Sequence, residues 1–99
     1  MLREKHWVWR CCRVQWKLTV LYDYRTVCGM DHLWVDIQLR RKTDTEGAYS
    51  NAIVGRADVA KGAPPSIKRY CEPWPLEVER QFNQQVRRAI DQTARKAVR

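Results

Sequence analysis

Thiols and imidazoles are the side chains of this sequence that could ligate a metal or attack a substrate. The chain has 99 residues, with four cysteines and two histidines. Cys28 and His32 stand four residues apart in a stretch that predicts a chain reversal, where both side chains could turn inward. A zinc site needs four converging ligands, and His6 and Cys71 could complete the set only through the fold. Cys28 and His32 are therefore the candidate metal ligands, but we expect reduced thiols, at least two of them buried, and no cofactor.

The sequence lacks the motifs that would make these thiols and imidazoles catalytic. The adjacent thiols of Cys11 and Cys12 should point to opposite faces of a strand, so they make a poor pair of ligands. No signature of a nucleophile surrounds Cys28 and His32, and the glycines are too scattered to form a phosphate loop. Paired carboxylates of a hydrolytic site are not visible either. We therefore expect that the protein is not an enzyme.

A mixture of basic and aromatic side chains is the stronger chemical signal, and it favours binding. The formal net charge is +8, without a run of five like charges, and the chain has five tryptophans. Cations attract phosphates, and each stack of a base on an aromatic ring contributes about 1–3 kcal/mol. The candidate binding residues are Trp7, Trp9, Arg13, Lys17, Trp34, Arg40, Arg41, Arg80, Arg87 and Arg88.

These candidate residues leave three interpretations open. The first is that they engage nucleic acid or a nucleic-acid–protein complex. Tryptophan and arginine are also enriched at protein interfaces, so the alternative is an adaptor or inhibitor, of the kind that phages and mobile elements encode, which binds an acidic protein surface. The third interpretation is that the tryptophans only fill the core.

Alternating residues predict the strands that would position these groups. Apolar and polar residues alternate over 14–22 and again over 33–40. A period of two gives each strand one buried and one solvent-facing side. The solvent-facing side would carry Lys17, Trp34 and Arg40, which makes it the expected binding surface.

The N-terminal strand is ambiguous. Residues 6–24 fit one long strand or two strands joined by an irregularity. A bulge near residues 10–13 would bury Trp7 and Trp9, whereas without a bulge both tryptophans stay on the solvent-facing side. The sequence does not decide between these arrangements.

Turn-forming residues and prolines divide the rest of the chain. We expect a reversal over residues 25–31 with Gly29 at positive φ, a second strand over about 32–42, a polar turn over 43–47, a weaker third strand over 48–59, an irregular proline-rich connector over 60–75 and a helix over 76–98. Trp74, between two prolines, would either fasten the start of the helix to the sheet or serve as a docking knob for a partner.

The helix should be amphipathic. Its apolar stripe consists of Phe82, Val86, Ala89, Ile90, Thr93 and Ala97, flanked by Leu76 and Val78. On the opposite side, Arg87, Asp91 and Arg95 alternate in charge at intervals of four residues. This spacing favours a self-paired, solvated face over one that reads a nucleic-acid groove.

Together these elements predict an α+β fold in one domain over residues 1–99. A three- to four-stranded, mainly antiparallel sheet, formed by residues 1–59, would carry one C-terminal α-helix packed on one face. One helix covers only part of such a sheet. The uncovered part and any exposed edge strand therefore favour a binding module and would allow a homodimer.

The sequence also bears on location. No stretch approaches the ~18–20 apolar residues that span a bilayer. Arg10 and Arg13 interrupt any apolar segment near the N-terminus, and no small-residue cleavage site follows. We expect a cytoplasmic protein that does not engage a membrane.

Overall fold

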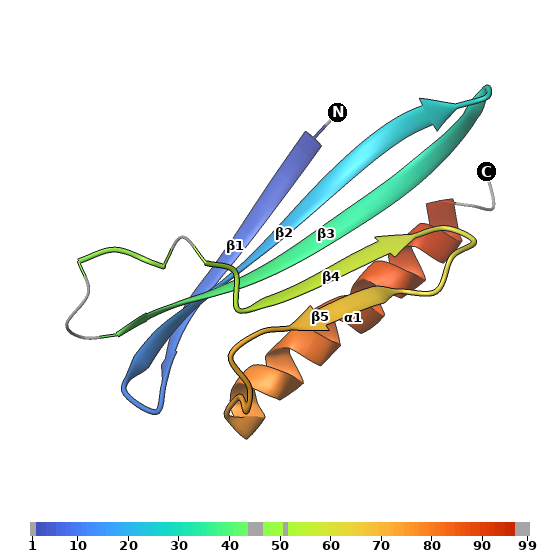
Figure 1. Ribbon diagram of the computed structural model, residues 1–99. Coiled ribbons are helices and arrows are strands. Elements are labelled where there is room, and N and C mark those ends of the chain that lie inside the picture. The colour runs from blue at the N-terminus through green and yellow to red at the C-terminus, as the bar shows by residue number, and fades with distance from the viewer. Residues whose placement is uncertain (1, 44–46, 51, 97–99) are drawn as a thin grey trace.

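The protein folds into a five-stranded antiparallel sheet with one C-terminal helix, as Figure 1 shows. This computed structural model describes residues 2–43, 47–50 and 52–96. The strands follow one another across the sheet in chain order, so that β1 and β5 form its two edges. Their bounds, with those of the helix, are β1 (Leu2–Cys11), β2 (Val14–Val27), β3 (Met30–Thr43), β4 (Gly55–Ala60), β5 (Ser66–Arg69) and α1 (Leu76–Lys96).

The α+β class and the C-terminal helix are confirmed, but the predicted number of strands is wrong. The fifth strand, β5, lies within residues 60–75, which were expected to be irregular. The prolines of that stretch flank the strand instead of interrupting it, since Pro64 and Pro65 precede Ser66. The predicted third strand over 48–59 is shorter than expected, because pairing with β3 begins only at Gly55. Most of the predicted turn over 43–47 lies outside the described residues.

A tight turn at Cys12 and Arg13 joins β1 to β2. Their φ angles are 57° and 64°, the left-handed conformation that a two-residue hairpin turn requires. The structure confirms the alternative of two strands, but a hairpin turn and not a bulge joins them. The turn places Trp9 directly opposite Trp16, and Trp7 lies on the same face two residues away. Both N-terminal tryptophans therefore lie on the face that the helix covers, not on the solvent-facing side.

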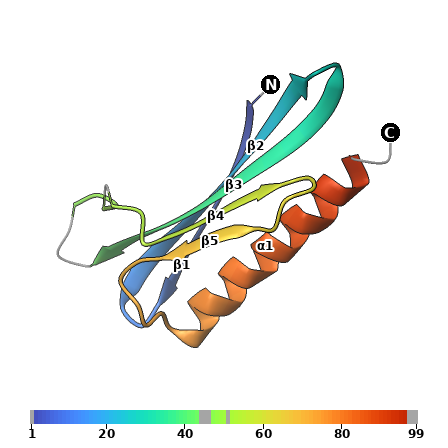
Figure 2. The same cartoon turned by 45° about the vertical axis from the view of Figure 1, so that its right-hand side comes forward.

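A second two-residue turn, at Cys28 and Gly29, joins β2 to β3. Gly29 has a φ of 77°, as predicted, and Cys28 has a φ of 53°. The reversal is thus narrower than the predicted 25–31, and the two strands are 14 residues long each. In Figures 1 and 2 this long hairpin reaches beyond the other strands at one end of the molecule.

The helix packs on one face of the sheet, where it contacts β3 and β4. Its buried side chains include Val78, Phe82, Val86, Ala89 and Thr93, as the predicted stripe required. Gln85 is buried as well. Two predicted members of the stripe are exposed, Ile90 at 41% and Leu76 at 85%, whereas Ala97 lies outside the described residues. The facing side of the sheet contributes Trp16, Leu18, Val20, Leu33, Val35, Ile37, Leu39, Ala57 and Val59 to the same core.

Trp74 fastens the start of the helix to the sheet, as one of the two interpretations predicted. Its side chain is 8% exposed and meets Phe82 edge to face, with ring centroids 5.2 Å apart. Its indole N–H donates a hydrogen bond to the carbonyl oxygen of Tyr70 at 3.2 Å. The ring lies directly on Gly55, where an added Cβ would come within 2.5 Å of it. The position of the helix thus depends on a glycine at the start of β4.

Candidate functional site

The sheet face opposite the helix carries the polar residues of the strands, arranged by register into bands. As expected, Lys17, Trp34 and Arg40 all belong to this open face. Lys17 pairs with Arg40 in the register of β2 and β3. Arg40 lies six positions after Trp34 in β3, a distance of about 20 Å along an extended strand. The predicted surface of mixed cations and rings is therefore not continuous, because Trp34 lies far from the two cations.

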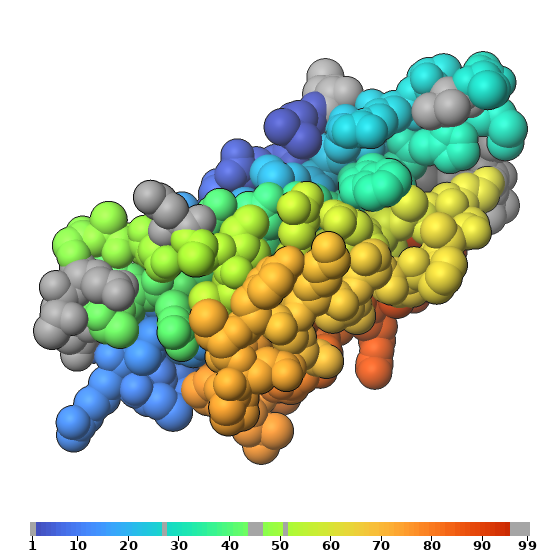
Figure 3. All heavy atoms as spheres, viewed as in Figure 1, coloured from blue at the N-terminus to red at the C-terminus, as the bar shows by residue number. Residues whose placement is uncertain are grey.

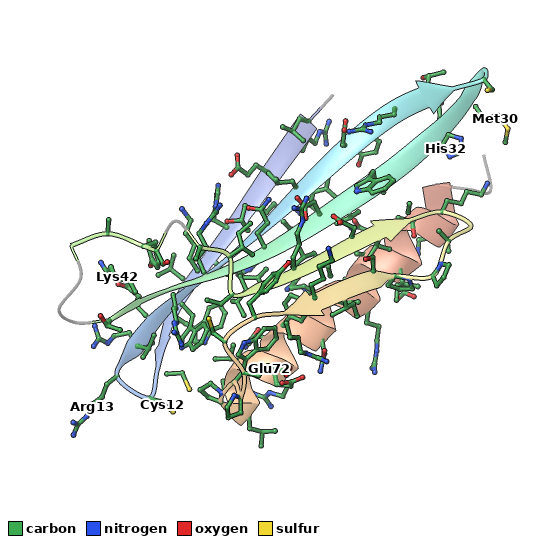
Figure 4. The ribbon with its side chains drawn as sticks, in the orientation of Figure 1. Cys12, Arg13, Met30, His32, Lys42 and Glu72 are labelled. Carbon is green, nitrogen blue, oxygen red and sulfur yellow. The ribbon has the colours of Figure 1, made fainter. Side chains whose placement is uncertain are left out.

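Basic residues gather at one end of the molecule, where the β1–β2 turn meets the end of β3. In Figure 4, Arg13 and Lys42 lie at this end, whereas Met30 and His32 lie at the other. Figure 3 shows the blue atoms of the turn close to the green atoms that end β3. We call this cluster the basic end, and it comprises Arg10, Arg13, Lys17, Arg40, Arg41 and Lys42.

Most cations of the basic end have no carboxylate partner in the described part of the chain. Arg10, Lys17, Arg40 and Lys42 occupy neighbouring positions on the open face. Arg41 points to the other face, beside Trp16 in the register, at the same end of the sheet. Among the residues that the structure describes, no carboxylate forms an ion pair with Arg13, Lys17, Arg40, Arg41 or Lys42.

Tyr49 adds an aromatic ring to the basic end. The ammonium nitrogen of Lys17 lies 5.6 Å from the ring centroid, and that of Lys42 lies 5.3 Å from it, so both make cation–π contacts. The adjacent Ser50 donates its backbone N–H to the carbonyl oxygen of Arg41 at 3.1 Å, which holds the segment against β3. Burial raises the pKa of the Tyr49 phenol. Sequence reasoning missed Tyr49, which it assigned to an irregular strand.

Acidic residues occupy the middle of the open face, between the basic end and Trp34. Arg56 donates hydrogen bonds to both carboxylate oxygens of Asp36, at 3.2 and 3.3 Å. Its Nε lies 3.7 Å from Asp58 Oδ1, which is buried and accepts no hydrogen bond within the described structure. Burial and the neighbouring Asp36 raise the pKa of Asp58, while Arg56 opposes the shift. This band is internally paired, so it offers little charge to a ligand.

Trp34 lies beyond the acidic band and is 41% exposed. The guanidinium carbon of Arg25 lies 5.9 Å from its ring centroid. Arg25 in turn pairs with Asp23 at 2.5 Å. The exposed face of Trp34 is therefore already in contact with a neutralised cation, unlike the rings expected at a phosphate-binding surface.

Trp7 and Trp9 are the predicted site residues that the structure moves furthest from expectation. Both are half-buried against the core on the helix side of β1, because the turn at residues 12 and 13 keeps them opposite apolar positions of β2. The Nε1 atom of Trp9 is buried and has no hydrogen-bond partner among the described residues. Neither ring belongs to the basic end on the open face.

The helix arginines form a separate surface. Arg80 pairs with Glu77 at 2.6 Å, and this contact, with the amide of Gln81, lowers the pKa of Glu77. Arg87 and Arg88 are exposed on α1. The predicted ladder of residues 87, 91 and 95 is wrong, since the described residues contain no ion pair among the three.

The thiols also depart from the predictions. The sulfur atoms of Cys11 and Cys12 lie 3.5 Å apart, because the positive φ of Cys12 swings its side chain beside its neighbour. This hydrogen bond and burial raise the pKa of the Cys11 thiol. Cys12, Cys28 and Cys71 are exposed, so the expectation of at least two buried cysteines is wrong.

Cys28 and His32 lie at the far end of the long β2–β3 hairpin, Cys28 in the turn and His32 near the start of β3. Over residues 2–43, 47–50 and 52–96, no group of three or more histidine, cysteine, aspartate or glutamate side chains could hold a metal ion. The two candidate ligands thus have no third ligand in that part of the chain.

Comparison of the chain with protein-family models, with curated proteins and with solved structures found no match. Within the described residues, none of the helical structure combines the length and the apolar character needed to cross a bilayer. The site must therefore be interpreted from its own geometry and charge.

Proposed function

We propose that this protein binds nucleic acid through the basic end. The observation that carries the proposal is the convergence of six basic side chains on one end of the sheet, five of them without a carboxylate partner among the described residues. Such a cluster creates a local positive potential that attracts a polyanion. Neutralising several phosphates releases condensed counterions, which is the main source of affinity in such complexes.

Tyr49 supports this proposal because it holds two like charges near each other. Lys17 and Lys42 both lie within 6 Å of its ring centroid, so one ring gathers two cations. A phosphate group that contacts both ammonium groups would neutralise this local charge. We infer that Lys17, Lys42 and the neighbouring Arg40 contact the phosphate backbone, while Tyr49 positions the two lysines.

Replacement of two of these cations tests the proposal. We expect the Lys17→Ala/Arg40→Ala variant to bind a fluorescent 20-nucleotide strand at least about tenfold more weakly than the wild type at low salt, because two charge-assisted contacts are lost. Fluorescence anisotropy measures this change. A Lys61→Ala/Arg95→Ala variant removes the same charge elsewhere, from the β4–β5 turn and the helix, and should bind within about twofold of the wild type.

Two outcomes would contradict the proposal. Equal weakening by both double variants would mean that net charge, and not the basic end, governs the interaction. Absence of binding to single- and double-stranded oligonucleotides at low salt, together with nuclease-resistant capture of an acidic protein from a host extract, would favour the adaptor or inhibitor alternative. The same cations would then serve a protein surface.

A further inference from the structure

The proposed function uses only Arg10 of the edge strand β1. This strand runs for ten residues in continuous register with β2, and no described strand pairs with its other side. It contains no proline and no bulge, two of the devices by which proteins protect an exposed edge. Two apolar side chains on it are exposed, Leu2 at 62% and Val8 at 52%. Figure 1 shows that β1 lies at the edge of the sheet remote from β5.

The turn geometry shows which backbone groups of β1 are available. In a two-residue hairpin the residues that flank the turn form a hydrogen-bonded pair, here Cys11 and Val14. Odd-numbered residues of β1 therefore direct their N–H and C=O groups toward β2. The outward-directed groups belong to the even-numbered residues, which are Leu2, Glu4, His6, Val8 and Arg10.

The charges along β1 are complementary to those of a second copy running in the opposite direction. With a two-fold axis at Trp7, Glu4 lies opposite the partner's Arg10, and the partner's Glu4 lies opposite Arg10. Lys5 lies opposite the partner's Trp9, a pairing of cation and ring. Opposite charges and aromatic contacts across an antiparallel pair each contribute roughly 0.2–1 kcal/mol. Within the monomer, Glu4 contacts His6 Nε2 at 3.0 Å, which keeps its carboxylate on the open face.

Other registers lack this complementarity. An axis at Lys5 would place this lysine directly opposite the partner's Lys5, which is repulsive. An axis at His6 would place Glu4 opposite the partner's Val8 and leave Arg10 opposite the partner's Leu2. Of these three registers, the axis at Trp7 alone places Glu4 and Arg10 opposite residues of opposite charge while pairing β1 over most of its length.

We propose that two copies of this chain associate through β1 to form a continuous ten-stranded antiparallel sheet with Trp7 at the two-fold axis. The association satisfies the outward backbone groups of β1 and covers Val8. It also brings Trp7 beside the partner's Trp7 in a non-hydrogen-bonded pair, the closer of the two antiparallel spacings. The two basic ends lie at opposite ends of the paired strands. The dimer contact shares only Arg10 with the basic end, whereas Lys17, Arg40 and Lys42, which we infer to contact phosphate, lie on β2 and β3.

A charge-swap experiment tests the pairing. Sedimentation equilibrium of nuclease-treated, nucleic-acid-free protein should show a dimer for the wild type at about 100 µM, and a monomer for Glu4→Arg, which opposes like charges twice. The Glu4→Arg/Arg10→Glu variant restores the opposite charges in reversed order and should recover the dimer. Circular dichroism of each variant confirms that the fold is retained.

A second variant tests the backbone contacts independently of charge. Val8→Pro deletes one outward-directed N–H without removing a hydrogen bond to β2, so we expect a folded monomer. A monomeric wild type, or a charge-swapped variant that stays monomeric while folded, would overturn the proposal. A dimer that persists in both Glu4→Arg and Val8→Pro would overturn it as well, because the contact would then lie elsewhere.

Discussion

The carboxyl group of Asp58 shows how a single residue is constrained by its surroundings. It is partly buried and lies beside a second carboxyl group at Asp36. The guanidinium of Arg56 donates hydrogen bonds to Asp36 and lies 3.7 Å from Asp58 Oδ1. Desolvation disfavours the charged form of an acid, and a like charge nearby adds to this effect. Ionised Asp58 therefore lowers the free energy of unfolding at neutral pH.

Asp58→Asn should remove this cost. The pKa of Asp58 is raised in the folded state, so the folded protein holds this proton more tightly than the unfolded chain does. The free energy of unfolding is therefore highest below the unfolded pKa and falls as the pH rises through the folded pKa. We expect the Asn variant to be more stable than the wild type at pH 7, by less than about 1 kcal/mol because the group is partly solvated. Urea denaturation at pH 7 and pH 3 measures the difference. If the Asn variant gains as much stability at pH 3 as at pH 7, the pKa of Asp58 is not raised by folding.

Alternation in the sequence identifies the face of a residue but not its neighbours along the strand. It correctly placed Lys17, Trp34 and Arg40 on the open face. It did not reveal that an acidic band separates Trp34 from the two cations, because that requires the register with β4. Tyr49 could not be found from periodicity, since it lies outside any strand and reaches the basic end only through the path of its segment.

The two hairpin turns differ in how well the local sequence predicts them. Gly29 marks one hairpin turn, and the prediction there succeeded. The β1–β2 turn consists of Cys12 and Arg13, neither of which favours positive φ, so no local signal announces it. The longer-range packing of Trp9 and Trp16 on one core specifies that turn instead. Without that turn, the sequence left open which face of the sheet Trp7 and Trp9 occupy.

Close contact between β4 and the connector before α1 sets the position of the helix. Gly55 leaves room for the Trp74 ring, and Arg69 lies over the same ring with its guanidinium carbon 5.5 Å from the centroid. The glycine in β4 suggested a bulge or an edge from sequence alone. In the structure this glycine leaves room for the indole of Trp74, which is distant in the sequence, so local sequence could not reveal its role.

Gly55→Ala tests this contact. The new methyl group would overlap the Trp74 ring, so we expect a loss of about 1–3 kcal/mol in the free energy of unfolding. Gly47→Ala is the matched control, because an added Cβ there meets nothing within 4 Å, and its effect should stay within about 0.5 kcal/mol. Chemical denaturation measures both. Equal stability of the two variants would show that the Trp74 contact does not constrain the helix.

Charge segregation is the property of the whole molecule on which the proposed function rests. The net charge of +8 does not by itself specify a binding surface, because basic residues occur on both faces and on the helix. The fold pairs many of them, as Arg25, Arg56, Arg69 and Arg80 each contact a carboxylate. The hairpin turn and the end of β3 then bring six other basic residues together at one end of the sheet.

The salt dependence of oligonucleotide binding tests this account most directly. If Lys17 and Arg40 each neutralise one phosphate, the slope of log K against log [salt] should be shallower by about 1.5 in the Lys17→Ala/Arg40→Ala variant than in the wild type. The slope of the Lys61→Ala/Arg95→Ala control should match the wild type. Identical slopes for all three proteins would contradict the claim that the basic end contacts the phosphate backbone.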